Sequence, residues 1–206
     1  MGSFRQRGLA WLMAKGTERY ERMVAPRKRA LFAGDLGDVV EIGAGTGPNL
    51  RYLEGSRSYL AIEPNPYMHP HLRAEIDRQR VEGSLLAMPA EVALAAMPDG
   101  SVDTVISTLV LCSVPKPGEL LDQIVRVLRP AGRILLLEHV GAQPGTALHT
   151  CQRCLTPAFR FFADGCRPHR DTRSLVEASR FQDVCLEEFC LPLGPISPHL
   201  CGWASK

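Results

Sequence analysis

A glycine-rich loop directly after a short apolar segment limits the folds open to this chain more than any other feature. Residues 38–42 read D-V-V-E-I, the pattern of a short buried strand, and run into G-A-G-T-G at 43–47. Glycines let the backbone turn tightly after a strand and approach a ligand closely, in conformations that a Cβ would obstruct. The sequence therefore predicts a cofactor held against this loop.

The rest of the chain alternates between strand and helix patterns. Apolar, β-branched segments at 59–63, 102–110 and 133–138 indicate strands, and helical spacing occurs at 70–80 and 118–128. We also expect a turn at 129–132, a helix over 171–179, a strand near 184–189 and a proline-rich stretch before Trp203. Such alternation predicts an α/β fold, with a mostly parallel sheet and helices on both faces.

The first 34 residues differ in character from the rest. We expect one or two amphipathic helices over 4–32, as a segment (1–34) separate from the main domain (35–206). This segment is basic, whereas the rest of the chain is slightly acidic. The segment could therefore be a lid, a peripheral membrane contact or a helix with one solvated face. Nothing in the body indicates nucleic-acid binding. The basic residues are Arg5, Arg7, Lys15, Arg19, Arg22, Arg27, Lys28 and Arg29.

Cysteine usage bears on the compartment. The chain has 7 cysteines, an odd number, and no apolar segment followed by a cleavage site. No apolar run approaches the roughly 18 residues of a spanning helix. We therefore expect free thiols and a cytoplasmic location, with the basic segment as the one candidate for contact with a membrane surface.

The glycine spacing and a later acid narrow the cofactor. Dinucleotide enzymes favour G-x-G-x-x-G, but Pro48 takes the sixth position here, which favours a cofactor without a pyrophosphate. Glu63 ends the second predicted strand, where a carboxylate can accept hydrogen bonds from both hydroxyls of a ribose. A nicotinamide dehydrogenase is therefore disfavoured, although Glu63 alone does not separate the two cofactor classes.

Several motifs in chain order are more specific than the loop alone. E-x-G-x-G-x-G at 41–47 is followed by Glu63, P-A-E at 89–91, P-D-G-S-V-D at 98–103 and R-V-L-R-P-A-G at 126–132. Together they resemble the class I methyltransferases that use S-adenosylmethionine (SAM), which have a Rossmann-like fold with a mostly parallel seven-stranded sheet. The resemblance implies SAM as cofactor, bound by Glu41, Gly43, Ala44, Gly45, Gly47, Glu63, Pro64, Asn65, Ala90, Glu91, Thr108 and Leu109.

By the same resemblance each group has a role. The glycines line the methionine portion, Glu41 seats its amino group through the loop, and Glu63 holds the ribose. Pro64 or Asn65 borders the adenine, the pair at 90–91 reaches its edge, and residues 108–111 close the pocket. Ala131 departs from the family, which usually has glycine there, and should alter only a turn.

A second set of motifs is similar to a narrower group. T-L-V-L-C-S-V at 108–114, E-H-V at 138–140, D-G-C at 164–166, R-D-T at 170–172 and P-H at 198–199 resemble the methyltransferase-like thiol S-methyltransferases of animals and their bacterial relatives. This resemblance implies a small-molecule acceptor, with a thiol or another soft apolar nucleophile first. Those proteins have a long apolar N-terminal segment, where this chain has a basic one. Two alternatives remain: an N- or C-methyltransferase of a lipid headgroup or quinone precursor, and a non-catalytic SAM-binding module.

Three residues are candidates for chemistry on the acceptor. His139 follows the predicted fifth strand at the edge where open α/β folds bind ligands, Asp164 lies in the D-G-C turn, and His199 lies near the C-terminus. A base near a thiol would help it to ionise. Each also has a structural alternative: His139 as a backbone partner, Asp164 as a turn former and His199 as a surface residue.

A zinc-like spacing also occurs. Cys151, Cys154, Cys166 and His169 spell C-x2-C-x11-C-x2-H. We expect no metal there, because the stretch reads as helix or loop packed on the substrate pocket and the similar family lacks the first two cysteines. Cys112 follows a buried strand and is interpreted as a small apolar filler.

Overall fold

Seven strands form one sheet in the order β3-β2-β1-β4-β5-β7-β6. The computed structural model describes residues 2–206, without the side chains of residues 2, 3, 12 and 14–17. The strands are β1 (Gly37–Ile42), β2 (Ser56–Ile62), β3 (Gly83–Leu86), β4 (Val102–Thr108), β5 (Leu128–His139), β6 (Asp183–Cys190) and β7 (Pro198–Ser205). The helices are α1 (Gly2–Leu31), α2 (His69–Gln79), α3 (Ala90–Ala96), α4 (Pro117–Val127), α5 (Ala147–Phe162) and α6 (Thr172–Glu177), with 3-10 turns η1 (Leu50–Tyr52) and η2 (Gly194–Ile196).

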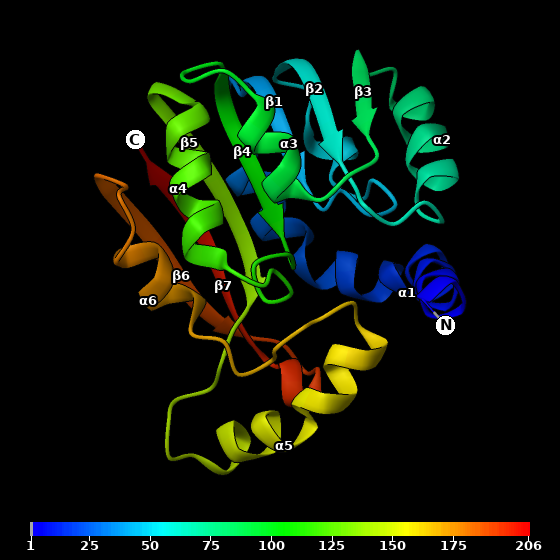
Figure 1. Ribbon diagram of the computed structural model, residues 1–206, viewed down its shortest axis with the longest axis vertical. Coiled ribbons are helices and arrows are strands. Elements are labelled where there is room, and N and C mark those ends of the chain that lie inside the picture. Colours follow the sequence, from blue (N-terminus) through cyan, green and yellow to red (C-terminus); the bar gives the residue numbers. More distant parts are fainter. Residues whose placement is uncertain (1) are drawn as a thin grey trace.

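The sheet is mostly parallel, as predicted. β1 to β5 run parallel to their neighbours, whereas β7 lies between β5 and β6 and is antiparallel to both. Figure 1 shows the parallel strands ending at one edge, next to the first half of α1 and near α5. That edge is where open α/β folds bind ligands.

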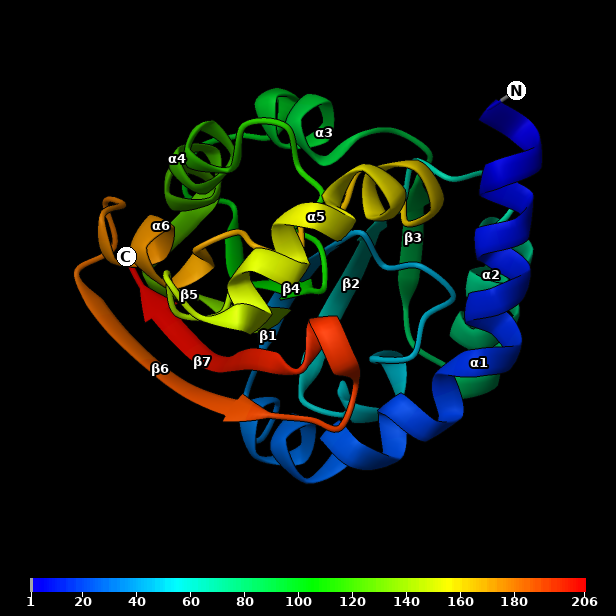
Figure 2. The same ribbon diagram turned by 90° about the horizontal axis from the view of Figure 1, so that it is seen from below.

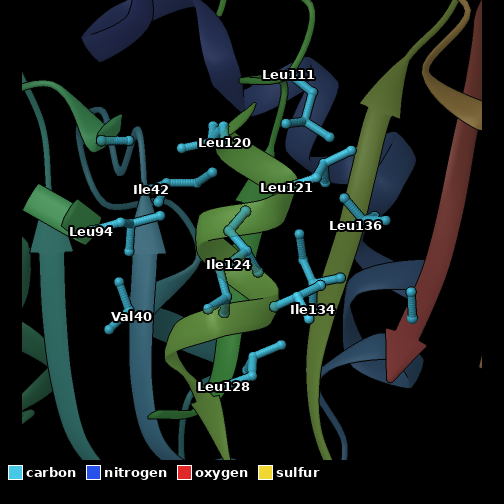
Figure 3. Packing of buried hydrophobic residues seen from close by; sticks show 14 of the residues in the cluster. Val40, Ile42, Leu94, Leu111, Leu120, Leu121, Ile124, Leu128, Ile134 and Leu136 are labelled. Carbon is cyan, nitrogen blue, oxygen red and sulfur yellow. The ribbon is translucent and has the colours of Figure 1, made fainter. Parts of the chain in front are cut away.

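Alternating residues of the central strands bury both faces of the sheet. Val40 and Ile134 point to the face covered by α3, α4 and α6, where Leu120, Leu121 and Ile124 of α4 fill the space (Figure 3). Val39 and Leu135, one position away, point to the face covered by α2, η1 and the end of α1. This period of two, with helices on both sides, explains why the central strands read as continuous apolar runs.

The structure corrects several details of the expected elements. The turn expected at 129–132 belongs to β5, where Ala131 has φ +63° and the pairing with β4 shifts its register. The proline-rich C-terminal stretch contains β7, and the short elements β3 and α3 had no clear sequence signal. β4 ends at Thr108, two residues earlier than expected, because Leu109 leaves the strand with φ +58°.

The N-terminal segment is one long helix that bends between its halves (Figure 2). Its second half packs Val24 against β5 and β7, and Phe32 just after it joins the core. Lys28, expected on a basic face, is fully buried with Nζ 2.6 Å from Glu21 Oε1. Lys15 lies outside the described side chains. No helix of the described residues is long and apolar enough to cross a membrane.

Candidate active site

The carboxyl edge of the sheet collects most of the residues that the sequence singled out. The glycine loop follows β1, Glu63 follows β2, Thr108 ends β4 and His139 ends β5. Because β7 is antiparallel, its start lies at the same edge, and His199 pairs with His139 in the β5–β7 register. The fold thus places most candidate cofactor-binding residues at the same edge of the sheet as His139 and His199, two of the three candidates for chemistry on the acceptor.

The glycine loop needs its glycines for conformation and for space. Gly43, Gly45 and Gly47 have φ of +60°, +58° and +83°. A Cβ on Gly43 would lie 2.5 Å from Cγ2 of Val110, so the loop after β4 packs directly on the loop after β1. Only glycine adopts such angles without strain. Ala44 is buried and packs into the core beneath the loop.

Glu63 presents a buried carboxylate beside that loop. Its Oε2 accepts a hydrogen bond from Gly45 N at 2.9 Å, and its Oε1 accepts one from Asn65 N at 2.7 Å. Burial raises the pKa of Glu63, and the two backbone hydrogen bonds oppose the rise. A carboxylate has about four lone-pair positions. Two positions are therefore left for further donors, which fits the two hydroxyls of a ribose.

Glu41 lies beneath the loop. Its carboxylate accepts hydrogen bonds from Asn49 Nδ2 at 2.7 Å and Tyr59 OH at 2.6 Å, and the same Asn49 amide donates to Thr108 Oγ1 at 3.0 Å. Burial raises the pKa of Glu41 to about 7, against the lowering effect of these bonds. Both carboxylate oxygens have protein partners. Glu41 therefore positions the loops after β1 and β4, and its influence on a cofactor passes through them.

Glu138 is a second buried acid that positions a loop, here the turn after β4. Its Oε1 accepts hydrogen bonds from Ser107 Oγ at 2.6 Å, Val110 N at 3.1 Å and Leu111 N at 3.2 Å. This anchor supports the left-handed backbone at Leu109, which turns the chain sharply out of β4. The positions of Leu109 and Val110 beside the glycine loop thus depend on a buried acid from the neighbouring strand.

A buried group of sulfur and nitrogen atoms occupies the other half of the edge. His139 Nε2 lies 3.2 Å from Cys166 Sγ, and Cys112 contacts both residues. Burial lowers the pKa of His139, but the Cys112 thiol and the Glu138 carboxylate outweigh it and raise that pKa overall. Sequence reasoning missed this group, because its members follow three different elements that only the folded sheet brings together.

His199 lies next to this group but behaves differently. It is 1% exposed, so its reading as a surface residue is wrong, and its Nδ1 lies 3.0 Å from the carbonyl oxygen of Ser197. Burial lowers the pKa of His199 to about 4. The ring is therefore neutral near pH 7, and it contacts the rings of Tyr20 and Phe189 in tilted arrangements and that of His139 edge-on.

The remaining candidates lie around the rim. Asp164 is exposed in the turn after α5, with φ +49°, and its charge contributes to the raised pKa of Glu63. Pro64 is exposed, while Ala90 is buried at the start of α3 with the half-buried Glu91 after it. These placements are compatible with an adenine pocket between the ends of β2 and β3.

The first half of α1 covers the cofactor side. The carbonyl oxygen of Gln6 accepts a hydrogen bond from the buried Asn65 amide at 3.1 Å, and a Cβ on Gly45 would lie 3.4 Å from Met13 Cε. Arg5 donates to the carbonyl oxygen of Arg160 in α5 at 3.3 Å. Helix α1 therefore contacts the glycine loop, the end of β2 and α5. This is the placement expected of a lid over the cofactor site.

The zinc-like spacing is not assembled in space. Cys151 and Cys154 are exposed on α5, and His169 Nδ1 lies 2.8 Å from Thr156 Oγ1. Cys166, the third member of the pattern, lies with Cys112 and His139 instead. Sequence spacing along a helix and loop was therefore a poor guide to which sulfur atoms meet.

Comparisons with known proteins agree with this geometry. A family model described as a methyltransferase domain matches residues 40–136. Human thiol S-methyltransferase TMT1A is 32% identical over 95% of this chain and 85% of its own length, and human TMT1B is 31% identical with the same coverage. The solved structure of Burkholderia thailandensis 1,6-didemethyltoxoflavin-N1-methyltransferase with bound S-adenosylhomocysteine has a TM-score of 0.67 and 20% identity, covering 100% of this chain and 88% of that one.

Fold, site and relatives together define a class I SAM-dependent methyltransferase. Within that class, the chain belongs to the family that includes the human thiol S-methyltransferases. The protein is thus an enzyme whose cofactor is SAM, as the resemblance implied.

Proposed function

We propose that this enzyme methylates the sulfur of a small apolar thiol. The observation that carries the proposal is the buried group of Cys112, His139 and Cys166, which lies beside the turn that packs on the glycine loop. All three residues are buried, and their thiol and imidazole groups are soft, so a soft, weakly hydrated acceptor suits the site. The relatives named above are thiol S-methyltransferases.

The chain's own contribution is to position and ionise the acceptor. Bound SAM supplies a methyl group on a sulfonium centre. The acceptor sulfur must be a thiolate to react well, so the thiol first gives its proton to the His139 imidazole. Its sulfur then bonds to the methyl carbon as the sulfonium–methyl bond breaks, and S-adenosylhomocysteine leaves. We assign the stabilisation of this thiolate to His139. Positioning in a site that excludes water supplies most of the remaining rate enhancement.

Calorimetry and a product assay test the proposal together. Purified protein is titrated with SAM, S-adenosylhomocysteine and NAD, and then supplied with SAM and a small alkyl thiol. We expect binding of the first two ligands only, and formation of the methyl thioether. Tight SAM binding without product from any of a series of alkyl thiols would contradict the acceptor. Methylation of a lipid headgroup or a quinone precursor in the same assay would favour the alternative.

We further propose that the enzyme is cytoplasmic and touches a membrane surface through α1 and α5. Seven free cysteines support a reducing compartment. Phe4, Trp11 and Phe162 are 84%, 61% and 70% exposed, and Arg5 lies 4.3 Å over the ring of Phe161. Aromatic side chains next to basic ones favour an interface with anionic lipid.

Vesicle flotation tests this contact. Binding to vesicles with anionic lipid should exceed binding to neutral vesicles, and Phe4→Ser with Phe162→Ser should weaken it severalfold. The exposed Val92 on α3 offers a matched control, because Val92→Ser also removes exposed apolar surface but lies outside α1 and α5. An equal loss of vesicle binding in the Val92→Ser control, or no vesicle binding by the unmodified protein, would contradict the membrane contact.

A further inference from the structure

Three side chains that commonly ligate metals meet at the acceptor end of the site. The ligand atoms of Cys112, His139 and Cys166 all lie within 4.8 Å of one another, and none of the three residues is more than 5% exposed. His139 Nδ1 is buried and has no hydrogen-bond partner among the described residues. The proposed function gives a role in the reaction to His139 alone among the three residues, so it does not explain why the two thiols lie beside it.

The donor atoms select a class of ion. Two sulfur atoms and one imidazole nitrogen suit zinc, whereas calcium and magnesium prefer oxygen ligands. A tetrahedral ion with bonds of about 2.3 Å to sulfur and about 2.0 Å to nitrogen holds such atoms roughly 3.5 Å apart. The 3.2 Å between His139 Nε2 and Cys166 Sγ is close to that separation. The other two separations are no more than 4.8 Å, so side-chain rotations can bring the three atoms around one ion.

The charges around the cluster are compatible with a divalent cation. Burying an unpaired thiolate is costly, but two thiolates balance the charge of a divalent ion. Two other charged groups act on the cluster, Glu138 and Arg170, and their charges are opposite. A divalent ion with two thiolate ligands thus adds no net charge to a buried region.

The three ligands are held in place by their own segments. Arg167 N donates to the carbonyl oxygen of Cys112 at 3.0 Å, and Gly141 N donates to that of Arg170 at 2.7 Å. The Arg170 guanidinium also donates to the carbonyl oxygens of Leu111 and Val114. The loop after α5 is therefore tied to the ends of β4 and β5. Such support keeps ligand geometry fixed without relying on the ion.

We propose that Cys112, His139 and Cys166 bind one zinc ion, whose fourth position receives the sulfur of the acceptor. The metal site stands on the geometry of the cluster, whereas the role of the fourth position rests on the proposed thiol acceptor. Catalytic zinc sites commonly have three protein ligands and one open position. A coordinated thiol loses its proton to solvent, so the ion would stabilise the acceptor thiolate and His139 would act as its ligand.

Metal content and cobalt spectroscopy test the site without any assay of activity. Protein purified under reducing conditions with added zinc should hold one ion per chain, and Co²⁺ should give the absorption bands of a thiolate-bound ion. Cys112→Ser and Cys166→Ser should lower the affinity for either ion by roughly tenfold or more. Cys151→Ser and Cys154→Ser are matched controls on exposed thiols and should change nothing. Zinc should raise the Tm of the unmodified protein and of the controls only. Protein that holds no stoichiometric metal, or controls that lose it equally, would overturn the proposal.

A variant at His139 tests its assignment as a metal ligand, and a thiol titration tests whether the fourth position of the ion receives the acceptor. His139→Cys keeps a ligand but removes the imidazole, so it should retain the ion, and loss of metal in a folded variant would overturn the assignment. An alkyl thiol should shift the cobalt spectrum. An unchanged spectrum with a thiol that the protein methylates would overturn the fourth position. Bound metal without methylation of any thiol would instead contradict the proposed function and leave the metal site standing.

Discussion

The two halves of the sheet's carboxyl edge are built in different ways. The cofactor half consists of backbone groups and a carboxylate, Gly43 to Gly47 with Glu63, all within two adjacent strand–loop units. The proposed acceptor half consists of side chains from the turn after β4, the end of β5 and the loop after α5, namely Cys112, His139 and Cys166. A local motif is enough to bind a cofactor that a whole class of enzymes shares. An acceptor that is particular to one family needs side chains from distant segments. We therefore expect substitutions in the cofactor half to weaken SAM binding and substitutions in the proposed acceptor half to lower kcat.

The largest expected effect comes from Gly43→Ala, which should damage the cofactor half and the turn after β4 together. The new Cβ would lie 2.5 Å from Val110 Cγ2 at a residue with φ +60°. Strain and overpacking each cost about 1–3 kcal/mol, so we expect about 2–6 kcal/mol less stability to denaturant and no measurable SAM binding. Gly118→Ala has nothing within 4 Å and serves as the control. A Gly43 variant as stable as this control would mean that the two loops do not pack as described.

Glu41→Gln should remove a pH dependence of stability that belongs to the cofactor half alone. Burial raises the pKa of Glu41 from 4.5 to about 7, so its contribution is fully present below pH 4.5 and is lost as pH rises through 7. At about 1.4 kcal/mol per pKa unit, this amounts to at most about 3.5 kcal/mol between pH 4.5 and 8. Urea unfolding of both proteins at several pH values measures the difference. Parallel pH profiles would show that folding does not shift the pKa of Glu41 and would contradict this prediction.

His139→Ala should affect the acceptor half only. We expect kcat to fall by roughly 100-fold, the lower end of what a group that helps to ionise an acceptor contributes, while the Kd for SAM stays within about twofold. Steady-state kinetics with an alkyl thiol and calorimetry with SAM give the two numbers. His199→Ala is an informative comparison, because that ring is neutral near pH 7 and bonded to Ser197. Equal losses of kcat and of SAM affinity in the His139 variant would contradict the separation of the halves.

The same division describes what sequence reasoning could reach. The glycine loop, Glu63 and the parallel strands follow from local patterns, because each motif and its partner are close along the chain. Cys112 was interpreted as a filler and Cys166 as part of a spacing with Cys151, since nothing local shows that β4, β5 and the loop after α5 converge. β7 was missed for a related reason: its proline and glycine mask a strand that is specified by pairing with β5 and β6.

Glu63→Ala should give the smallest effect and the cleanest one. The variant loses the carboxylate that accepts from Gly45 N and Asn65 N and that we expect to hold the ribose. A lost charged hydrogen-bond partner costs about 1.5–3 kcal/mol, so the Kd for SAM should rise roughly 10- to 150-fold in calorimetry. At saturating SAM, kcat should stay close to that of the unmodified enzyme, because the acceptor half is untouched. Glu82→Ala, an exposed acid before β3, is the matched control. Unchanged SAM affinity would mean that the ribose is held elsewhere, and a large fall in kcat at saturation would mean that the two halves are coupled through the loops that Glu41 and Glu138 position.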